Sequence, residues 1–393
     1  MKILFLNHNY IGYGTYWRCV NLGRHLARRG HQVTLVTVSD KDFDLKISKK
    51  RIEKGMELII LPRIKFAQYH TGHTLRALLN TALVLTKPYD LLHVFVFPVH
   101  PMALPAVVGK IIRRKPLVID GDDLWRGGWA NYHPWPVKKQ LELCEDKIGF
   151  LADRITVVSE KMKDRFLKAG IKKEKIVKIP NGASVEEIKP MKQELARKKL
   201  KLDNKAPLVL VMGHTYTEGL FVFLRAFAEV VKKEPKVKLL FLGKMALSKT
   251  DEKKLERVSQ EIGKEKIIFT GERPFKEVPL YLAAADVLAL PMDDDPIEEA
   301  RFPMRLGDYL SSGRPIVANA VGEVKKILED YDCGLISPPR DSDRFAQSII
   351  RVLGDKKLAI KLGRQARKTA EDVLAWSHLV TDLERVYQEV LKR

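Results

Sequence analysis

The stretch MKILFLNHNYIGYGTYWRCVNLGRHLARRGHQVTLVTV, residues 1–38, decides the fold class. Lys2–Asn7 is a continuous apolar run, which is typical of a strand buried on both faces. After a loop with two glycines, Tyr16–Arg29 has the apolar spacing of an amphipathic helix. Gln32–Val38 then returns to a buried strand. The order strand, helix, strand predicts an α/β protein with a parallel sheet.

The same alternation continues to the end of the chain and restarts once. In the first half we expect strands at Met56–Leu61, Leu91–Phe97, Pro116–Ile119, Ile155–Val158 and Ile176–Ile179, and helices at Thr74–Thr86, Met102–Ile112 and Pro136–Leu151. In the second half we expect strands at Leu208–Met212, Lys238–Leu242, Ile267–Thr270, Val287–Leu290 and Ile316–Ala318, and helices at Leu220–Lys232, Thr250–Ile262, Val278–Ala284, Pro303–Ser311 and Arg344–Leu353. The sequence therefore predicts two tandem, Rossmann-like, doubly wound sheets.

A polar segment after the turn at 180–182 marks the expected domain boundary. We predict an N-terminal domain over residues 1–184, a C-terminal domain over 185–375, and a last helix over 376–393. Two sheets in tandem would enclose a cleft, with ligands at the carboxyl ends of the strands.

The composition of the 393 residues excludes several classes of protein. Hydrophobic residues make up 45%, which fits a folded protein with sizeable cores. The three cysteines are far apart, so a disulfide scaffold and a cysteine-rich zinc site are disfavoured and a cytoplasmic setting is expected. No signal segment is visible. The apolar window Leu91–Val108 contains prolines and histidines, which argues against a membrane span.

The positive charge is concentrated near the N-terminus. The chain has a formal net charge of +21, and residues 1–115 hold 19 basic and 6 acidic residues. Such asymmetry indicates an anionic partner, either an anionic membrane surface, a phosphorylated substrate or nucleic acid. A lysine-rich surface of a heat-stable protein is the alternative. Nucleic acid is disfavoured because no recognition motif is present.

The first candidate site is the loop between the first strand and the first helix. Gly12 and Gly14 would let the backbone approach a ligand, and the helix that follows Thr15 offers free N–H groups to an anion. Trp17 stands where a dinucleotide fingerprint needs its third glycine, so NAD binding is disfavoured. A plain tight turn is the alternative.

Three carboxylates, Asp120, Asp122 and Asp123, follow the fifth strand. They are candidates for orienting sugar hydroxyls or for proton transfer, and a helix cap is the alternative. We expect no metal at this cluster. His100, in the loop after the fourth strand, is a further catalytic candidate, whereas His93 lies mid-strand and is expected to be a core residue.

Three tryptophans follow the carboxylates within eleven residues. Trp125, Trp129 and Trp135 would suit stacking on an acceptor sugar or contact with a lipid interface, and core packing is the alternative.

In the second half, two segments carry the chemistry. Gly213 and His214 follow its first strand. The denser segment is Glu299-Ala-Arg301-Phe302-Pro303-Met304-Arg305-Leu-Gly-Asp308. With Pro303 as the first residue of a helix, the backbone amides of residues 303–305 form an anion site. A diphosphate would take these amides and an arginine, and Asp308 would accept from ribose hydroxyls.

These residues resemble the GT-B-type glycosyltransferases, specifically the retaining family-4 group, along essentially the whole chain. The resemblance is strongest in RFPMRLGDYLSSGRPIVA, residues 301–318, and in Gly322-Glu323. Supporting stretches are Ala152–Glu160, Ile179–Gly182, Phe269–Gly271 and Ala285–Val287.

The resemblance implies a nucleotide-sugar donor on the second domain and a glycan or lipid-linked acceptor on the first. It also implies retention of anomeric configuration, no cofactor, and a last helix that returns to the first domain. On that basis the loop at Gly12–Thr15 and Gly271 face the donor. Several members of the group act at the inner membrane face, which leaves a peripheral membrane location open.

The chain departs from the family pattern at three places. The family pairs two glutamates eight residues apart, but Ala300 stands eight before Asp308, so Glu299 beside it becomes the catalytic candidate. The basic residues expected after Gly213 are missing, and Arg301 and Arg305 would replace them. A histidine expected two residues after His93 is Phe95. A sugar-nucleotide epimerase and a non-catalytic binding protein remain as alternatives.

Overall fold

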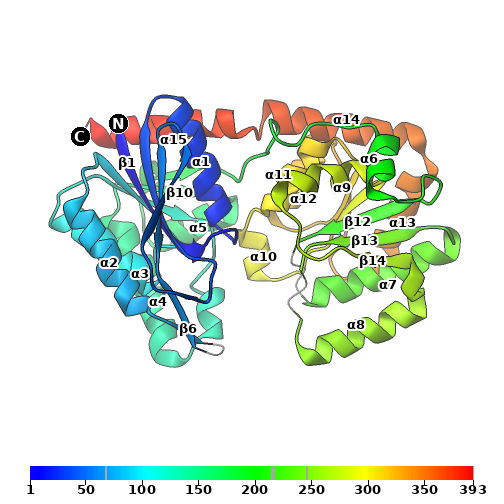
Figure 1. The fold of residues 1–393 in the computed structure, drawn as a ribbon, viewed down its shortest axis with the longest axis horizontal. Coiled ribbons are helices and arrows are strands. Elements are labelled where there is room, and N and C mark those ends of the chain that lie inside the picture. Colours follow the sequence, from blue (N-terminus) through cyan, green and yellow to red (C-terminus); the bar gives the residue numbers. More distant parts are fainter. Residues whose placement is uncertain (67–68, 214–216, 245–246, 393) are drawn as a thin grey trace. The chain divides into compact units, whose positions relative to one another are not determined.

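The computed structural model describes residues 1–66, 69–213, 217–244 and 247–392. The chain forms two compact units, each built around its own sheet (Figure 1). The first comprises Met1–Asn181 with Trp376–Arg393, and the second comprises Gly182–Ala375. The predicted pair of Rossmann-like sheets is thereby confirmed.

The sheet of the first unit has eight strands in the order β11-β10-β9-β8-β1-β2-β5-β4. Its strands are β1 (Lys2–Tyr10), β2 (Gln32–Val38), β4 (Ser48–Glu53), β5 (Met56–Leu61), β8 (Leu91–Phe95), β9 (Leu117–Gly121), β10 (Arg154–Val157) and β11 (Ile176–Lys178). Its helices are α1 (Tyr16–Arg28), α2 (His73–Thr86), α3 (His100–Ile111), α4 (Trp135–Leu151), α5 (Glu160–Lys168), and the short η1 (Trp129–Tyr132) and η2 (Lys173–Lys175). The chain runs outward in opposite directions from β1 and β8, so the topological switch point lies between them.

An antiparallel insertion interrupts the expected alternation between β2 and α2. Strand β4 pairs antiparallel with β5, and β3 (Phe43–Asp44), β6 (Arg63–Phe66) and β7 (Tyr69–Thr71) form a separate small sheet. These strands were not predicted from the sequence, because they carry no buried apolar run. Four of the six residues of β4 are exposed and three of those are basic, as suits an edge strand protected by charge.

The sheet of the second unit has the strand order β14-β13-β12-β15-β16-β17, which is the Rossmann order with its switch point between β12 and β15. Its strands are β12 (Leu208–Met212), β13 (Lys238–Leu242), β14 (Ile267–Phe269), β15 (Val287–Leu290), β16 (Ile316–Asn319) and β17 (Leu335–Ser337). Its helices are α6 (Gln193–Leu200), α7 (Thr217–Lys233), α8 (Lys249–Ile262), α9 (Val278–Ala284), α10 (Pro296–Ala300), α11 (Met304–Ser312), α12 (Gly322–Asp330), α13 (Ser342–Gly354) and α14 (Lys356–Asp372), with η3 (Lys264–Lys266) and η4 (Phe275–Glu277).

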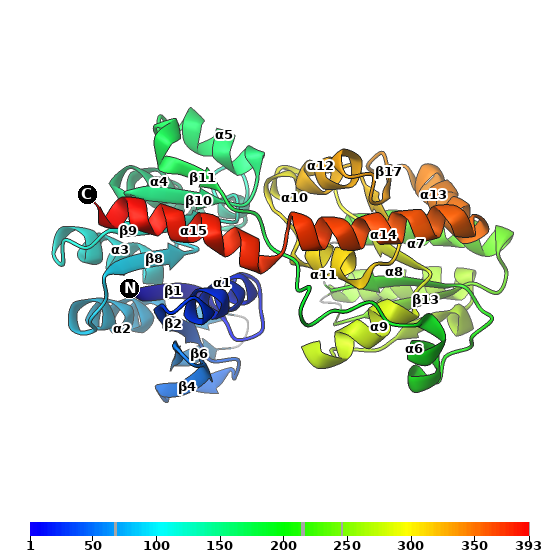
Figure 2. The same ribbon diagram turned by 90° about the horizontal axis from the view of Figure 1, so that it is seen from above.

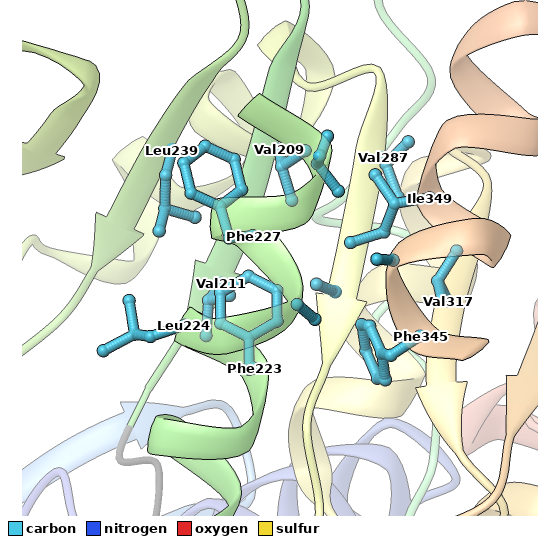
Figure 3. Close-up of a cluster of buried hydrophobic side chains, with 14 of the residues drawn as sticks. Val209, Val211, Phe223, Leu224, Phe227, Leu239, Val287, Val317, Phe345 and Ile349 are labelled. Atoms are coloured by element: carbon cyan, nitrogen blue, oxygen red, sulfur yellow. The ribbon is translucent and has the colours of Figure 1, made fainter. Parts of the chain in front are cut away.

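The core of the second unit is aromatic on its helical side. Phe223 and Phe227 of α7 and Phe345 of α13 are fully buried against valines and leucines of the sheet (Figure 3). Phe223 meets Phe345 edge to face, with ring centroids 5.7 Å apart. This packing fixes α7 and α13 on one face of the strands and leaves the strand ends to the loops.

Two helices near the C-terminus have different sequence signals. Helix α15 (Trp376–Leu391) was predicted from its apolar stripe, and it packs beside α1 in the first unit (Figure 2). Helix α14 was not predicted, and the residues at its buried positions are mostly small. A Cβ at Gly363 would lie 2.3 Å from the carbonyl oxygen of Gly313, so backbones and not large side chains meet there. The buried face of α14 has helical spacing, but apart from Leu362 it carries only small or polar side chains (Gly363, Ala366, Thr369 and Ala370).

Candidate functional site

The glycine loop of the first unit joins β1 to α1 in a tight turn. Gly12 and Gly14 have φ of +86° and +53°, values that favour glycine. The indole Nε1 of Trp17 donates to the carbonyl oxygen of Gly12 at 2.8 Å. A Cβ on Gly14 would lie 2.2 Å from the side-chain nitrogen of Asn9, whereas nothing lies within 4 Å of one on Gly12. Gly14 is therefore required by the turn, and Gly12 presents open backbone.

The carboxylate of Asp120 lies in the interior of the first unit, where it is paired with Arg18. It accepts two hydrogen bonds from Arg18, Nε to Oδ1 at 3.0 Å and Nη2 to Oδ2 at 2.9 Å. The hydroxyl of Thr156 donates to Oδ2 at 2.5 Å. Both members of the ion pair are 1% exposed. Three acceptor positions of Asp120 are thus used within the fold, and its catalytic role stays a prediction.

His93 belongs to the same buried network. The Tyr387 hydroxyl, from α15, lies 2.6 Å from Nδ1 of His93, and the Thr156 hydroxyl lies 3.4 Å from Nε2. Burial lowers the pKa of His93 to about 3, so the imidazole is neutral. As its mid-strand position predicted, His93 is a core residue.

Asp122 and Asp123 lie nearer the surface than Asp120. The hydroxyl of Thr15 donates to Oδ2 of Asp122, which ties the glycine loop to the end of β9. Burial, with the neighbouring Asp123 and Asp120, raises the pKa of Asp122 well above its usual value. Trp129 donates from Nε1 to Asp123 at 3.3 Å. Asp122 is thus the carboxyl group of the three that remains a candidate for proton transfer.

The aromatic loop after β9 separates the three predicted tryptophans. Glu145 of α4 accepts from the backbone N–H groups of Trp125 and Arg126, at 3.3 and 3.0 Å, and so anchors the loop. Trp125 lines a cavity of about 760 Å³ together with His100. Trp135 begins α4 and is 76% exposed. Core packing is excluded for Trp135, and of the three only Trp125 is among the described residues that line this cavity.

The second unit presents three glycines at the ends of three adjacent strands. Gly213, Gly243 and Gly271 follow β12, β13 and β14 with φ of +82°, +129° and +66°. A Cβ on Gly243 would lie 3.3 Å from the backbone of Gly213, and Gly243 donates to the carbonyl oxygen of Gly271 at 3.1 Å. His214, the other candidate here, lies outside the described residues.

Arg305 reaches across the switch point of this sheet. Its Nη1 donates to the carbonyl oxygen of Met212, at the end of β12, at 3.1 Å. Its Nη2 lies 3.4 Å from the carbonyl oxygen of Pro291, just after β15. Ligands of doubly wound sheets bind at this position. The guanidinium is thereby held where the predicted donor would lie.

The start of α11 differs from the expectation in one respect. Pro303 is the N-cap and Met304 the first helical residue. Proline has no N–H group and Leu306 donates to the carbonyl oxygen of Pro303, so the amides of Met304 and Arg305 are the ones left at the helix start. Phe302 is 3% exposed, so its side chain is buried in the core, and its contact with a donor stays a prediction.

The acidic residues before α11 are divided between the interior and the surface. Arg301 forms an ion pair with Glu298, which is 1% exposed. Burial raises the pKa of Glu298, against the effect of Arg301 and Arg305. Glu299, the candidate by sequence, is partly exposed. Arg301 is therefore engaged by Glu298, which leaves Arg305 as the stronger candidate for binding phosphate.

Asp308 faces the segment that opens the second unit. Its carboxyl accepts from Ser184, and burial together with Glu187 raises its pKa to about 7. A Cβ on Gly307 would lie 2.2 Å from the carbonyl oxygen of Gly182, so α11 packs directly on this segment. Asp308 is on the same helix as Arg305.

Comparison with known proteins matches both halves of the chain. The family described as "Glycosyltransferase Family 4" matches residues 14–187, and "Glycosyl transferases group 1" matches residues 192–369. The chain belongs to the family-4 type of GT-B glycosyltransferases. It is 22% identical to a D-inositol 3-phosphate glycosyltransferase of Corynebacterium efficiens over 388 residues, 94% of this chain and 89% of that protein.

Solved structures share the fold of this glycosyltransferase. A sucrose-phosphate synthase from Thermosynechococcus elongatus has a TM-score of 0.77 at 19% identity and covers 100% of this chain and 99% of its own. The Anabaena protein HepE, in complex with UDP and glucose, has a TM-score of 0.74 at 18% identity with 99% of both chains covered.

Two general features of the described residues bear on the chemistry of this glycosyltransferase. In the described part of the chain, no helix is long and apolar enough to cross a membrane. The same residues bring together no group of three or more His, Cys, Asp or Glu side chains that would hold a metal ion.

Arg18 was not among the predicted residues, because no local sequence pattern indicates its role. It lies on the buried face of an amphipathic helix, 102 residues from its carboxylate partner. The one indirect signal is that a buried carboxylate such as Asp120 requires a buried cation as its partner.

We predict that Asp120→Asn lowers the free energy of unfolding by about 3–5 kcal/mol, because it leaves the buried Arg18 without a counter-charge. Urea denaturation of the whole glycosyltransferase measures this. Asp123→Asn is the control and should cost less than about 1 kcal/mol, since an amide oxygen still accepts from Trp129. Equal stability of the two variants would show that the pair contributes nothing.

Proposed function

We propose that this glycosyltransferase moves a sugar from a nucleotide-sugar donor to a glycan or lipid-linked acceptor with retention of anomeric configuration. The observation that carries the donor assignment is the position of Arg305 at the switch point of the second unit, beside Gly213. Similar proteins are named for the same donor class. HepE was solved with UDP-glucose, and a relative from Mycolicibacterium smegmatis is named as GDP-mannose-dependent.

In this proposal the donor diphosphate lies against Arg305 and the first amides of α11. A guanidinium and a helix N-terminus both favour phosphate, through charge and through oriented N–H groups. Asp308 accepts hydrogen bonds from the ribose hydroxyls. Arg301 lies just before α11 and is held there by its ion pair with Glu298.

The first unit supplies the acceptor side. His100 and Trp125 line one cavity, and Asp122 offers a carboxyl group with a raised pKa. We assign the orientation of the acceptor hydroxyl to His100 or Asp122. In this proposal the donor phosphate takes the proton of that hydroxyl, as the resemblance to the retaining family-4 group implies.

The first prediction for the donor site concerns Arg305. Arg305→Ala should weaken binding of the preferred nucleoside diphosphate by about 1.5–3 kcal/mol, roughly 10- to 100-fold, because a charge-assisted hydrogen bond is lost. Calorimetric titration with UDP, GDP and ADP measures this and identifies the base. Arg351→Ala, an exposed arginine on α13, is the matched control and should bind as the parent protein does. Unchanged affinity in Arg305→Ala would move the diphosphate elsewhere.

The second prediction uses the raised pKa of Asp308. Only the ionised carboxyl accepts on both oxygens, so affinity for the free nucleoside should rise as pH increases through about 7. Because the folded pKa exceeds the unfolded one, the stability that Asp308 contributes is present below pH ~4 and is lost as pH rises through about 7.

Asp308→Asn should abolish the trend in affinity and should reduce the trend in stability by the share that Asp308 contributes, since Asp122 and Glu298 also have raised pKa values. Titration with a nucleoside, which carries no titrating phosphate, and thermal melting from pH 5 to pH 9 report them separately. A pH-independent affinity in the parent protein would remove Asp308 from the ribose site.

We further propose that the first unit works against an anionic membrane surface, which suits a lipid-linked acceptor. Ile111 and Ile112 are 59% and 65% exposed at the end of α3, and Arg113, Arg114 and Lys115 follow them. Exposed apolar residues with adjacent cations are typical of interfacial binding.

Co-sedimentation with phosphatidylcholine vesicles, with and without phosphatidylglycerol, tests this. The protein should bind the anionic vesicles, and Ile111→Ser with Ile112→Ser should weaken binding by about tenfold or more. Leu195→Ser, 47% exposed on α6 of the second unit, is the control. Equal partitioning onto neutral vesicles, or no effect of the double substitution, would contradict the proposal.

A further inference from the structure

The cavity of the first unit lies at the switch point of its sheet. Its volume is about 760 Å³, which accommodates a monosaccharide with a substituent. Its walls come from the ends of β1 and β2, the starts of α2 and α3, the loop after β9 and the first turns of α4. Trp125 contributes an aromatic side chain to one wall. The cavity therefore lies where doubly wound sheets bind their ligands.

The charge of this cavity is one-sided. Arg63 and Arg76 line it at 5% and 4% exposed, and its described lining residues include no aspartate or glutamate. Arg63 is partly compensated, because it lies 3.1 Å from Asp42 and donates to the carbonyl oxygen of Asp40. It also lies over the ring of Tyr10.

Arg76 has no such compensation. In the part of the chain that the structure describes, its side chain has no ion-pair or hydrogen-bond partner, and its Nε is buried without an acceptor. Burial and the nearby Arg63 lower the pKa of Arg76 to about 10, so it remains charged at neutral pH. A buried cation without a counter-ion is unfavourable in the fold unless a ligand supplies the charge.

Two helix starts add to the positive potential. Helices α2 and α3, of 14 and 12 residues, begin at His73 and His100, which both line the cavity. Neither helix has a side-chain cap or an acidic residue in its first turn. The positive ends of both dipoles therefore lie at the wall that carries Arg76.

From this arrangement we infer that the acceptor of this enzyme carries a phosphate group, which Arg76 binds in this cavity with Arg63 and the first turns of α2 and α3 beside it. That the ligand is the acceptor rests on the proposed function, whereas the presence of an anion site rests on the geometry of the cavity alone. Trp125 then faces the sugar or polyol that bears the phosphate.

The test is titration of the full-length protein with inorganic phosphate and with glucose 6-phosphate at constant ionic strength, with glucose as the neutral comparison. Calorimetry and thermal melting are the readouts. We expect saturable binding of both anions, and Arg76→Met should weaken it by about 10- to 100-fold. Arg76→Lys should retain part of it.

The stability of Arg76→Met separates a binding role from a structural one. Since the substitution removes an uncompensated buried cation, its melting temperature should equal or exceed that of the parent protein. Arg51→Met, which alters an exposed arginine of β4 in the same unit but outside the cavity, should leave anion binding unchanged. A lower melting temperature with unchanged anion affinity in Arg76→Met would overturn the inference.

Arg305→Ala distinguishes the two anion sites. It should bind glucose 6-phosphate as the parent protein does, while nucleoside diphosphate binding falls. Loss of glucose 6-phosphate binding in Arg305→Ala but not in Arg76→Met, or no saturable anion binding at all, would refute the cavity assignment. Absence of nucleotide binding with anion binding intact would instead refute the proposed donor site.

Discussion

The ion pair between Arg18 and Asp120 is the interaction on which the first unit depends. Besides the carboxylate, the guanidinium donates to the carbonyl oxygens of Ile179 and Pro180, at 2.8 and 3.0 Å, and to Oδ1 of Asn181 at 3.1 Å. It thereby fixes α1 to β9 and to the segment where the chain leaves the unit. A buried charge pair is stable only when its remaining hydrogen-bonding positions are filled, and here they are.

That network also reaches the C-terminus. Thr156 links Asp120 to His93, and His93 links to Tyr387 of α15. The neutral imidazole of His93 thus connects the Tyr387 hydroxyl with the Thr156 hydroxyl that donates to Asp120, and it adds no charge to the interior. Helix α15 is therefore held by a polar contact as well as by its apolar stripe.

The second unit has a neutral counterpart in Tyr309, whose hydroxyl accepts from the Met212 N–H at 2.8 Å and lies 3.2 Å from the Ala289 carbonyl oxygen.

The sequence was sufficient for what depends on local periodicity and on glycine. It predicted the strands that flank both switch points, the turn at Gly12–Gly14 and the apolar helix α15. It did not distinguish Asp120 from Asp122 and Asp123, because three adjacent carboxylates look alike until the partner of each is known. Their partners are Arg18, Thr15 and Trp129, two of which lie more than 100 residues away. Nor did it find α14, whose buried face carries mostly small residues.

The excess of positive charge near the N-terminus likewise does not identify the residues that bind an anion. A count over residues 1–115 treats every lysine and arginine alike, whereas solvent screens the exposed ones and neighbouring carboxylates neutralise others. Arg24 and Arg28, for example, share Glu53. What matters for binding is a cation that is both desolvated and uncompensated, since its interaction with an anion is weakened neither by water nor by a competing carboxylate. Arg76 meets both conditions because α2 turns it inward beside Arg63. The net charge indicated an anionic partner, and only the fold shows which of the basic residues are placed to bind one.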